Sequence, residues 1–157
     1  MYYLILSKTY TDGAAFLFGE HPVIVYTDRY HRIDHFWFTL AHEIGHVVNH
    51  LNYNSSYFID DDNSLKTDLE KEADRYANKI LKGKEILDFF GNGKRISKSQ
   101  VRLCSEFLNI SEAIVVGTLH YNKKLEYSHL RFLLNAPKDF IPIEYRPEEN
   151  GLISSLL

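Results

Sequence analysis

The strongest constraint on this 157-residue chain is the segment FWFTLAHEIGHVVNHL at residues 36–51. Its apolar positions recur with the period of an α-helix, and it contains the pattern His-Glu-x-x-His. On a helix of about 3.6 residues per turn, His42 and His46 lie one turn apart on one face, so both imidazoles can bind one ion. This arrangement predicts a zinc site, in which Glu43 takes a proton from a water molecule held by the ion.

Composition limits how such a site can be completed. Cys104 is the single cysteine, so a multi-cysteine zinc site is excluded and the remaining ligands must be histidines or carboxylates. A net charge of -3 argues against an extended nucleic-acid surface. The N-terminus lacks the features of a secretory signal, and no segment reaches the roughly 20 apolar residues of a membrane span. We therefore expect a cytoplasmic protein with a single domain over residues 1–157.

The pattern of elements predicts an α+β fold. A small antiparallel or mixed sheet near the N-terminus would pack on the His-Glu-x-x-His helix, on a second ligand-bearing helix and on C-terminal helices. The helix that carries the motif is expected to start near Ile33, with Asp34 as its N-cap. Strands are expected at 2–6, 14–18 and 23–27, the second helix at 65–81, further helices at 85–90, 99–108, 112–121 and 129–134, a loop at 52–63 and an irregular tail at 135–157.

The strand that begins at Val23 follows a proline. Since Pro22 has no N–H for a ladder hydrogen bond, this strand is expected at an edge of the sheet. An edge strand beside an active site can pair with an extended peptide, which makes four residues candidates for substrate binding. They are Val23, Ile24, Val25 and Tyr26. A purely structural strand fits the same pattern.

A catalytic zinc needs a third protein ligand and an open position. A histidine ten residues after His42 is excluded, because that position is Asn52. His50 lies about 80° round the helix from His42, which aims it poorly at the same ion. It is expected behind the ligands or on the surface.

The second helix offers carboxylates. Glu70 and Asp74 lie one turn apart there, in the spacing of glutamate-type zincins. Glu70 would bind zinc, and Asp74 would accept a hydrogen bond from a ligand histidine and hold its tautomer. Glu72, about 200° round from Glu70, should face away.

A competing interpretation of Glu70 is a capping box. Residues 67–70, Thr-Asp-Leu-Glu, fit that motif, which would turn Glu70 back to its own helix. If Ser64 caps the helix in place of Thr67, Glu70 is free to bind the ion. We favour this alternative because the metal site otherwise lacks a third ligand.

The motif in its surroundings resembles the ImmA/IrrE-type zinc metallopeptidases. The resemblance rests on FTLAHEIGHVV at 38–48 and on ExEADRYA at 70–77, and extends to residues 13–16, 22–24 and 114–119. It implies a gluzincin-like α+β fold, with His42, His46 and Glu70 as zinc ligands and Glu43 as the catalytic glutamate. Asp74 falls where many members have asparagine.

The same resemblance implies a role in the cell. Members are intracellular peptidases of bacteria or phages that often cut a helix-turn-helix repressor or an antitoxin-like regulator, which releases genes of a mobile element or a stress response. A protein of that class is the expected partner, without direct contact to nucleic acid or membrane. Because the chain begins close to the sheet, without the N-terminal helices or DNA-binding domain of many relatives, we expect a minimal member or one half of a split system.

Two other functions fit parts of the sequence. A zinc-binding interaction module with little or no proteolysis would carry the same motif. A DNA-binding regulator would use residues 99–120, which loosely resemble a helix-turn-helix. Its second helix, at 112–119, has no Lys or Arg to contact phosphate or guanine, which argues against this alternative.

Overall fold

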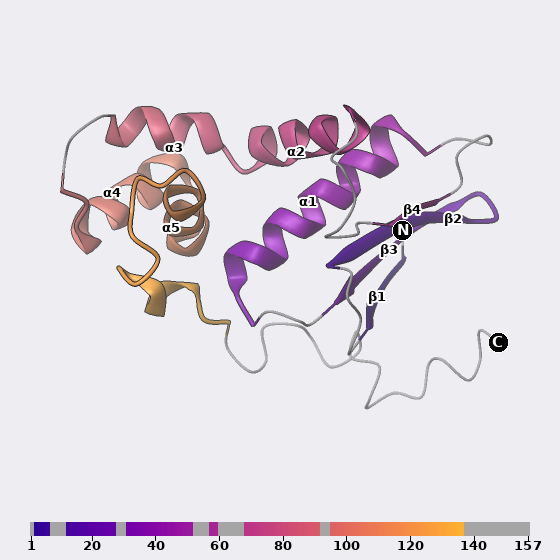
Figure 1. The fold of residues 1–157 in the computed structure, drawn as a ribbon, viewed down its shortest axis with the longest axis horizontal. Coiled ribbons are helices and arrows are strands. Elements are labelled where there is room, and N and C mark those ends of the chain that lie inside the picture. The colour runs from indigo at the N-terminus through magenta and orange to yellow at the C-terminus, as the bar shows by residue number, and fades with distance from the viewer. Residues whose placement is uncertain are drawn as a thin grey trace.

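The computed structural model describes residues 2–6, 12–27, 31–51, 57–59, 68–91 and 95–136. It has strands β1 (Tyr2–Leu6), β2 (Gly13–Phe18), β3 (His21–Thr27) and β4 (Tyr57–Ile59), helices α1 (Ile33–Asn49), α2 (Asp68–Ile80), α3 (Gly83–Phe90), α4 (Lys98–Leu108) and α5 (Glu112–Tyr121), and the short 3-10 helix η1 (Arg131–Leu134). The α+β prediction is confirmed (Figure 1). Most of the expected tail, residues 137–157, lies outside the described residues, and the single domain stays a prediction.

The sheet is mixed. Its strand order is β1-β3-β2-β4, with β1 parallel to β3 and the other neighbours antiparallel. Strands β2 and β3 form a hairpin whose turn contains Gly19 at φ +62°, a left-handed conformation that glycine adopts without strain. Strand β4 falls within the stretch 52–63 that was expected to be a loop, so that prediction is wrong for Tyr57–Ile59. Three residues are too short for an alternating pattern to be recognised.

The prediction that β3 lies at an edge of the sheet is wrong. Ile24 pairs with Tyr3 of β1 on one side and with Ala15 of β2 on the other. The ladder with β1 begins at Val23, so Pro22 lies outside it and its missing N–H is tolerated there. Ile24, Val25 and Tyr26 are also buried, and the expected substrate-binding stretch Val23–Tyr26 is therefore an interior strand that cannot pair with a peptide.

Helix α1 begins six residues after the end of β3. Its N-cap is Arg32, in extended conformation, so the prediction of Asp34 as N-cap is wrong by two residues. Arg32 donates hydrogen bonds to both carboxylate oxygens of Asp34, at 3.1 and 2.6 Å. Asp34 lies in the first helical turn, where a negative charge is favoured by the helix dipole.

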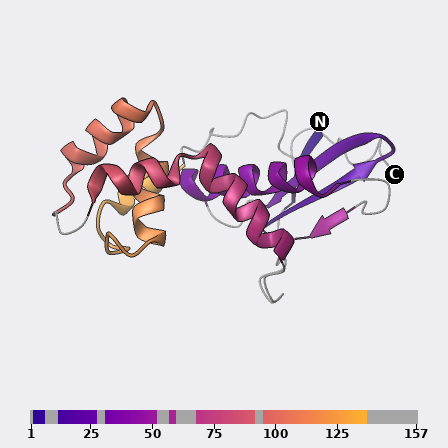
Figure 2. The ribbon, with the colours of Figure 1, turned by 90° about the horizontal axis from the view of Figure 1, so that it is seen from above.

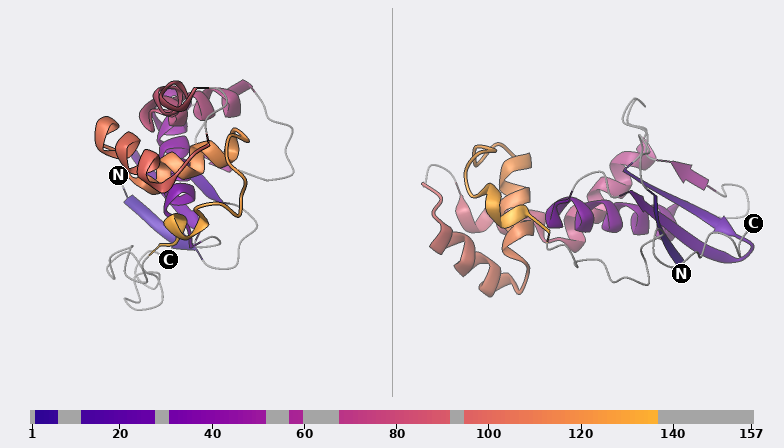
Figure 3. Two further views of the ribbon diagram at one scale, coloured as in Figure 1. Left: turned by 90° about the vertical axis from the view of Figure 1, so that its left-hand side faces the viewer. Right: turned by 90° about the horizontal axis from the view of Figure 1, so that it is seen from below.

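The two ends of the molecule are joined by α1. Figure 2 shows the sheet at one end and α3, α4 and α5 at the other, with α1 and α2 running between them, and the right-hand view of Figure 3 agrees. Helix α1 packs against β2 and β3 on one side and contacts α2 and α5 on others. The C-terminal helices enclose an apolar core. Its fully buried members include Ile86, Val101, Cys104, Val115, Val116 and Leu119.

This core also decides the DNA-binding alternative. Helix α5, the expected recognition helix, contacts α1, α3, α4 and η1, and six of its ten residues are buried. A helix enclosed in this way cannot enter a DNA groove, so that interpretation is wrong. The described residues contain no helix that is long and apolar enough to cross a membrane.

Candidate metal centre

A close crossing of α1 and α2 brings the candidate ligands together. Ala73 and Ala77 of α2 are fully buried, and a Cβ added to Gly45 of α1 would lie only 3.1 Å from the Cα of Ala73. Because the separation of packed helices depends on the side chains at the contact, these small residues let α2 lie close to α1. Glu70, one turn before Ala73, is thereby carried over the two motif histidines.

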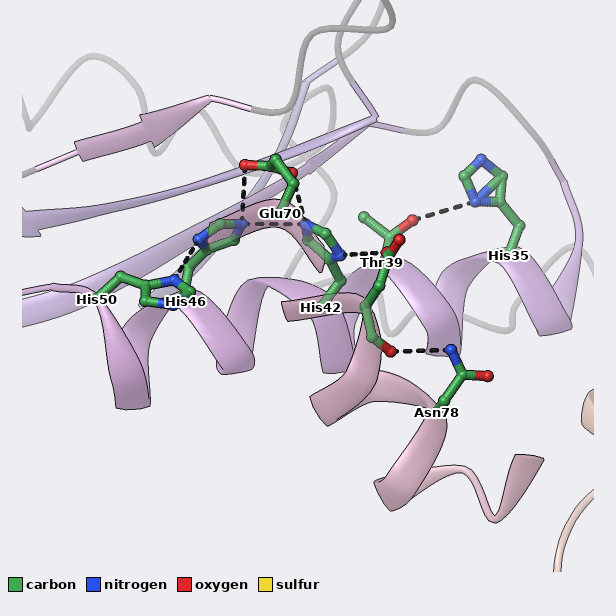
Figure 4. Close-up of polar contacts among 8 residues, drawn as sticks. His35, Thr39, His42, His46, His50, Glu70 and Asn78 are labelled. Atoms are coloured by element: carbon green, nitrogen blue, oxygen red, sulfur yellow. Dashed lines mark hydrogen bonds and ion pairs between the residues drawn. The ribbon is translucent and has the colours of Figure 1, made fainter. Parts of the chain in front are cut away.

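Three side chains converge at this crossing (Figure 4). His42 Nε2 lies 3.0 Å from His46 Nε2 and 3.2 Å from Glu70 Oε2. His46 Nε2 lies 3.3 Å from Glu70 Oε1. Both histidines are buried, at 5% and 1% exposure, while the Glu70 side chain keeps 15%. The group is therefore open to solvent mainly on the side of the carboxylate.

Asp74 determines the proton position on His42. Its Oδ1 lies 3.1 Å from His42 Nδ1. An ionised carboxylate can only accept, so His42 donates from Nδ1. In a neutral ring, Nε2 then carries a lone pair, which points toward His46 and Glu70.

The donor set fits a tetrahedral ion. Donors about 2.0–2.2 Å from a tetrahedral zinc are separated from one another by about 3.3 Å, close to the distances between these three side chains. The lone pair of His42 faces carboxylate oxygens of Glu70, an arrangement that repels unless a cation lies between them. Two imidazole nitrogens and one carboxylate are also the ligands that zinc takes in catalytic sites.

Glu43 lies on another side of α1, under the start of β2. It is 1% exposed, and a Cβ added to Gly13 would lie 2.7 Å from its Oε1. The same Cβ would lie 2.8 Å from Cγ2 of Thr39, one helical turn earlier. The absence of a side chain at Gly13 is therefore what lets β2 lie against this face of the helix.

Comparison with protein families supports the geometry. The model of the M78 peptidase family described as the IrrE N-terminal-like domain matches residues 2–120. The chain belongs to this family. The predicted resemblance is thus confirmed, and in this M78-family metallopeptidase His42, His46 and Glu70 form an HExxH-type group that could hold a metal ion. No curated protein matches the chain.

The electrostatic surroundings keep one histidine of this M78 member neutral. The pKa of His46 is lowered from 6.5 to about 4, chiefly by burial and then by the neighbouring rings of His42 and His50, against an opposing effect of Asp74. A histidine must be deprotonated at one nitrogen to bind a metal ion. His46 is therefore ready to bind at neutral pH without first losing a proton.

Most predicted residues of the site lie where the sequence suggested. His42, His46 and Glu70 come together, and Asp74 contacts His42. The carboxylate of Glu70 faces the histidines, as expected if Glu70 binds the ion and does not cap its own helix. The residues proposed for the cap of α2, at 64 and 67, lie outside the described residues.

His50 lies behind a ligand histidine, one of the two positions expected for it, whereas the orientation of Glu72 was misjudged from the sequence. His50, the C-cap of α1, is 7% exposed, and its Nδ1 lies 2.9 Å from His46 Nδ1. Glu72 was expected to face away, but its Oε2 lies 3.4 Å from His50 Nε2. The i, i+4 spacing of His46 and His50 was the available signal, because residues at this spacing are neighbours on a helix.

Proposed function

We propose that the chain is a zinc-dependent endopeptidase that cuts a helix-turn-helix repressor or an antitoxin-like regulator encoded nearby. The observation that carries the catalytic part is the convergence of His42, His46 and Glu70 next to a buried Glu43 in an M78-family chain. The substrate class rests on the resemblance to ImmA/IrrE-type peptidases.

In this proposal His42, His46 and Glu70 hold Zn²⁺. When bound, the ion polarises a substrate carbonyl and lowers the pKa of water toward 7. The chain's own residues supply the rest. Asp74 holds the Nδ1–H of His42, which fixes the ring with its lone pair on Nε2, the atom that would bind the ion.

Glu43 is proposed to move the proton. A carboxylate directly after a ligand histidine can accept the proton of the attacking water and then deliver it to the leaving amine. Its burial under β2 favours a single orientation of the carboxylate. Burial would also strengthen the electrostatic interaction between this carboxylate and a bound ion, because the surroundings have a low dielectric constant. Gly13 shapes this position by leaving the room that the carboxylate occupies.

The experiment is co-expression of the chain with the regulator encoded beside its gene, followed by detection of cleavage products. Glu43→Gln keeps the shape of the side chain but cannot accept the proton, so cleavage should fall by about 10²–10⁴-fold. Zinc content should stay at one equivalent, since Glu43 is not a proposed ligand. Cleavage at the original rate by this variant contradicts the mechanism.

The same experiment addresses the alternative of a zinc-binding interaction module. In that case the chain would bind Zn²⁺ and the regulator, yet the regulator would remain intact with both the parent chain and Glu43→Gln. Cleavage that disappears in the variant argues for the peptidase.

A further inference from the structure

A series of side-chain contacts leads from His46 away from the metal site. The Nδ1 of His46 lies 2.9 Å from His50 Nδ1, and His50 Nε2 lies 3.4 Å from Glu72 Oε2 (Figure 4 shows the two histidines). His50 is buried, while the Glu72 side chain is 51% exposed. The two rings meet at 60°, with centroids 5.0 Å apart, which is compatible with an in-plane hydrogen bond between ring nitrogens.

The hydrogen bonds from His46 through His50 to Glu72 can run in only one donor-to-acceptor direction. The Glu72 carboxylate can only accept, so His50 donates from Nε2. A neutral His50 then has an unprotonated Nδ1, which accepts from His46 Nδ1. A neutral His46 with its proton on Nδ1 has its lone pair on Nε2, the atom that faces His42 and Glu70.

Each of the two motif histidines thus has a carboxylate that fixes its Nδ1 proton, directly for His42 and through a second imidazole for His46. Asp74 accepts directly from His42, and Glu72 acts on His46 through one additional imidazole. Hydrogen bonds of this kind fix the tautomer and the ring orientation of a metal-binding histidine. Without them the proton of a neutral imidazole can lie on either nitrogen, and one of the two tautomers cannot bind.

We infer that His50 and Glu72 are positioning residues that hold His46 as its Nδ1–H tautomer and aim its Nε2 at the metal ion. The inference rests on the proposed metal centre but not on the identity of the substrate. A purely structural role is the competing account, in which His50 only fills space at the end of α1.

Zinc affinity, measured by competition with a chromophoric chelator, separates the two accounts. His50→Leu keeps a similar volume and removes the acceptor, so Zn²⁺ should bind about 10–100-fold more weakly. His50→Gln retains a side-chain oxygen that can accept from His46, and affinity should recover most of this loss. Glu72→Leu should weaken binding by less than His50→Leu, because Glu72 is half exposed and acts through His50.

The matched control is Asp68→Asn. It removes a negative charge from the same helix at a residue that pairs with Lys71 on the surface, so affinity should not change. A loss in Asp68→Asn equal to that in Glu72→Leu would mean that only the total charge of α2 matters, and would overturn the role of Glu72.

A second measurement is independent of metal. Long-range ¹H–¹⁵N correlation spectra of the metal-free protein at pH 7.5 report which nitrogen of each histidine is protonated. His46 should be Nδ1–H in the parent chain and a mixture of tautomers in His50→Leu. Unchanged zinc affinity and an unchanged tautomer in His50→Leu would overturn the inference, as would an equal loss of affinity in His50→Gln and His50→Leu.

The outcome for the metal centre itself is read from His46→Gln. Loss of zinc binding in this variant with full binding in His50→Leu overturns the positioning role and leaves the proposed function standing. Full zinc binding in His46→Gln contradicts the metal centre, and the inference falls with it.

Discussion

Helix α1 contacts two buried regions of opposite character. Around the C-terminal helices the buried side chains are apolar, and Val101, Val115 and Leu119 are completely enclosed. Around the motif α1 also buries polar side chains, namely His42 and His46 beside the small alanines of α2 and Glu43 under β2, all at 5% exposure or less. Apolar groups stabilise a fold by leaving water, whereas buried polar groups are tolerated only with hydrogen-bonding or charged partners.

The difference suggests a division of tasks. The apolar core should supply most of the free energy of folding, and the polar crossing should be nearly neutral in stability until an ion is bound. A region that is not needed for stability can retain groups that repel one another when no cation is present, which is what a metal site requires. The predictions below test this division.

The largest effect should come from the apolar core. Leu119→Ala removes a completely buried side chain at the centre of the C-terminal helices and should lower the free energy of unfolding by about 2–5 kcal/mol. Zinc affinity of the folded fraction should be unchanged. Leu103→Ala on α4 is the control, because this leucine is 57% exposed and its removal should cost less than about 1 kcal/mol. Urea unfolding of the metal-free chain measures both.

The next effect concerns the polar crossing. Glu70→Ala removes a proposed ligand and should weaken Zn²⁺ binding by more than about 100-fold, beyond the loss expected for a residue that only supports a ligand. The metal-free protein should unfold at nearly the same urea concentration as the parent chain. A strong destabilisation of the metal-free form would show that the crossing does stabilise the fold, and would contradict the division of tasks.

How far the sequence predicted these regions depends on the range of the interactions. The motif histidines and the Glu70 and Asp74 pair follow from helical spacing, which is local, and the structure brings them together. The position of β3 follows from its parallel pairing with β1, a long-range contact that no local pattern around Pro22 reveals. Glu72 was misjudged because its helical angle shows only that it points away from Glu70, and not that it reaches His50, the C-cap of α1.

The two regions should also respond differently to acid. The pKa of His46 is lowered from 6.5 to about 4, chiefly by burial, so between these values the unfolded chain binds a proton that the folded chain does not. Stability from this group is complete above pH 6.5 and is lost as the pH falls toward 4. One pKa unit corresponds to about 1.4 kcal/mol, and the unfolded group is half protonated at pH 6.5, so His46 should cost the metal-free protein about 1–2 kcal/mol of stability between pH 6.5 and 5.

His46→Gln is the variant that isolates this contribution, because glutamine does not titrate. Its free energy of unfolding should change less over the same pH interval than that of the parent chain. Equal slopes for the two proteins would show that His46 is not the group whose burial opposes protonation.

The smallest effect should follow from the contact between the sheet and α1. Gly13→Ala places a Cβ 2.7 Å from Glu43 Oε1 and 2.8 Å from Thr39 Cγ2, closer than these atoms can approach, so the Glu43 carboxylate must shift. Because small displacements of a catalytic group reduce rates strongly, cleavage of the regulator should slow by about tenfold. Zinc affinity should hold, since the proposed ligands come from other positions. If Gly13→Ala lost both zinc binding and activity, this prediction would be contradicted. Strand β2 would then position the metal ligands as well as Glu43.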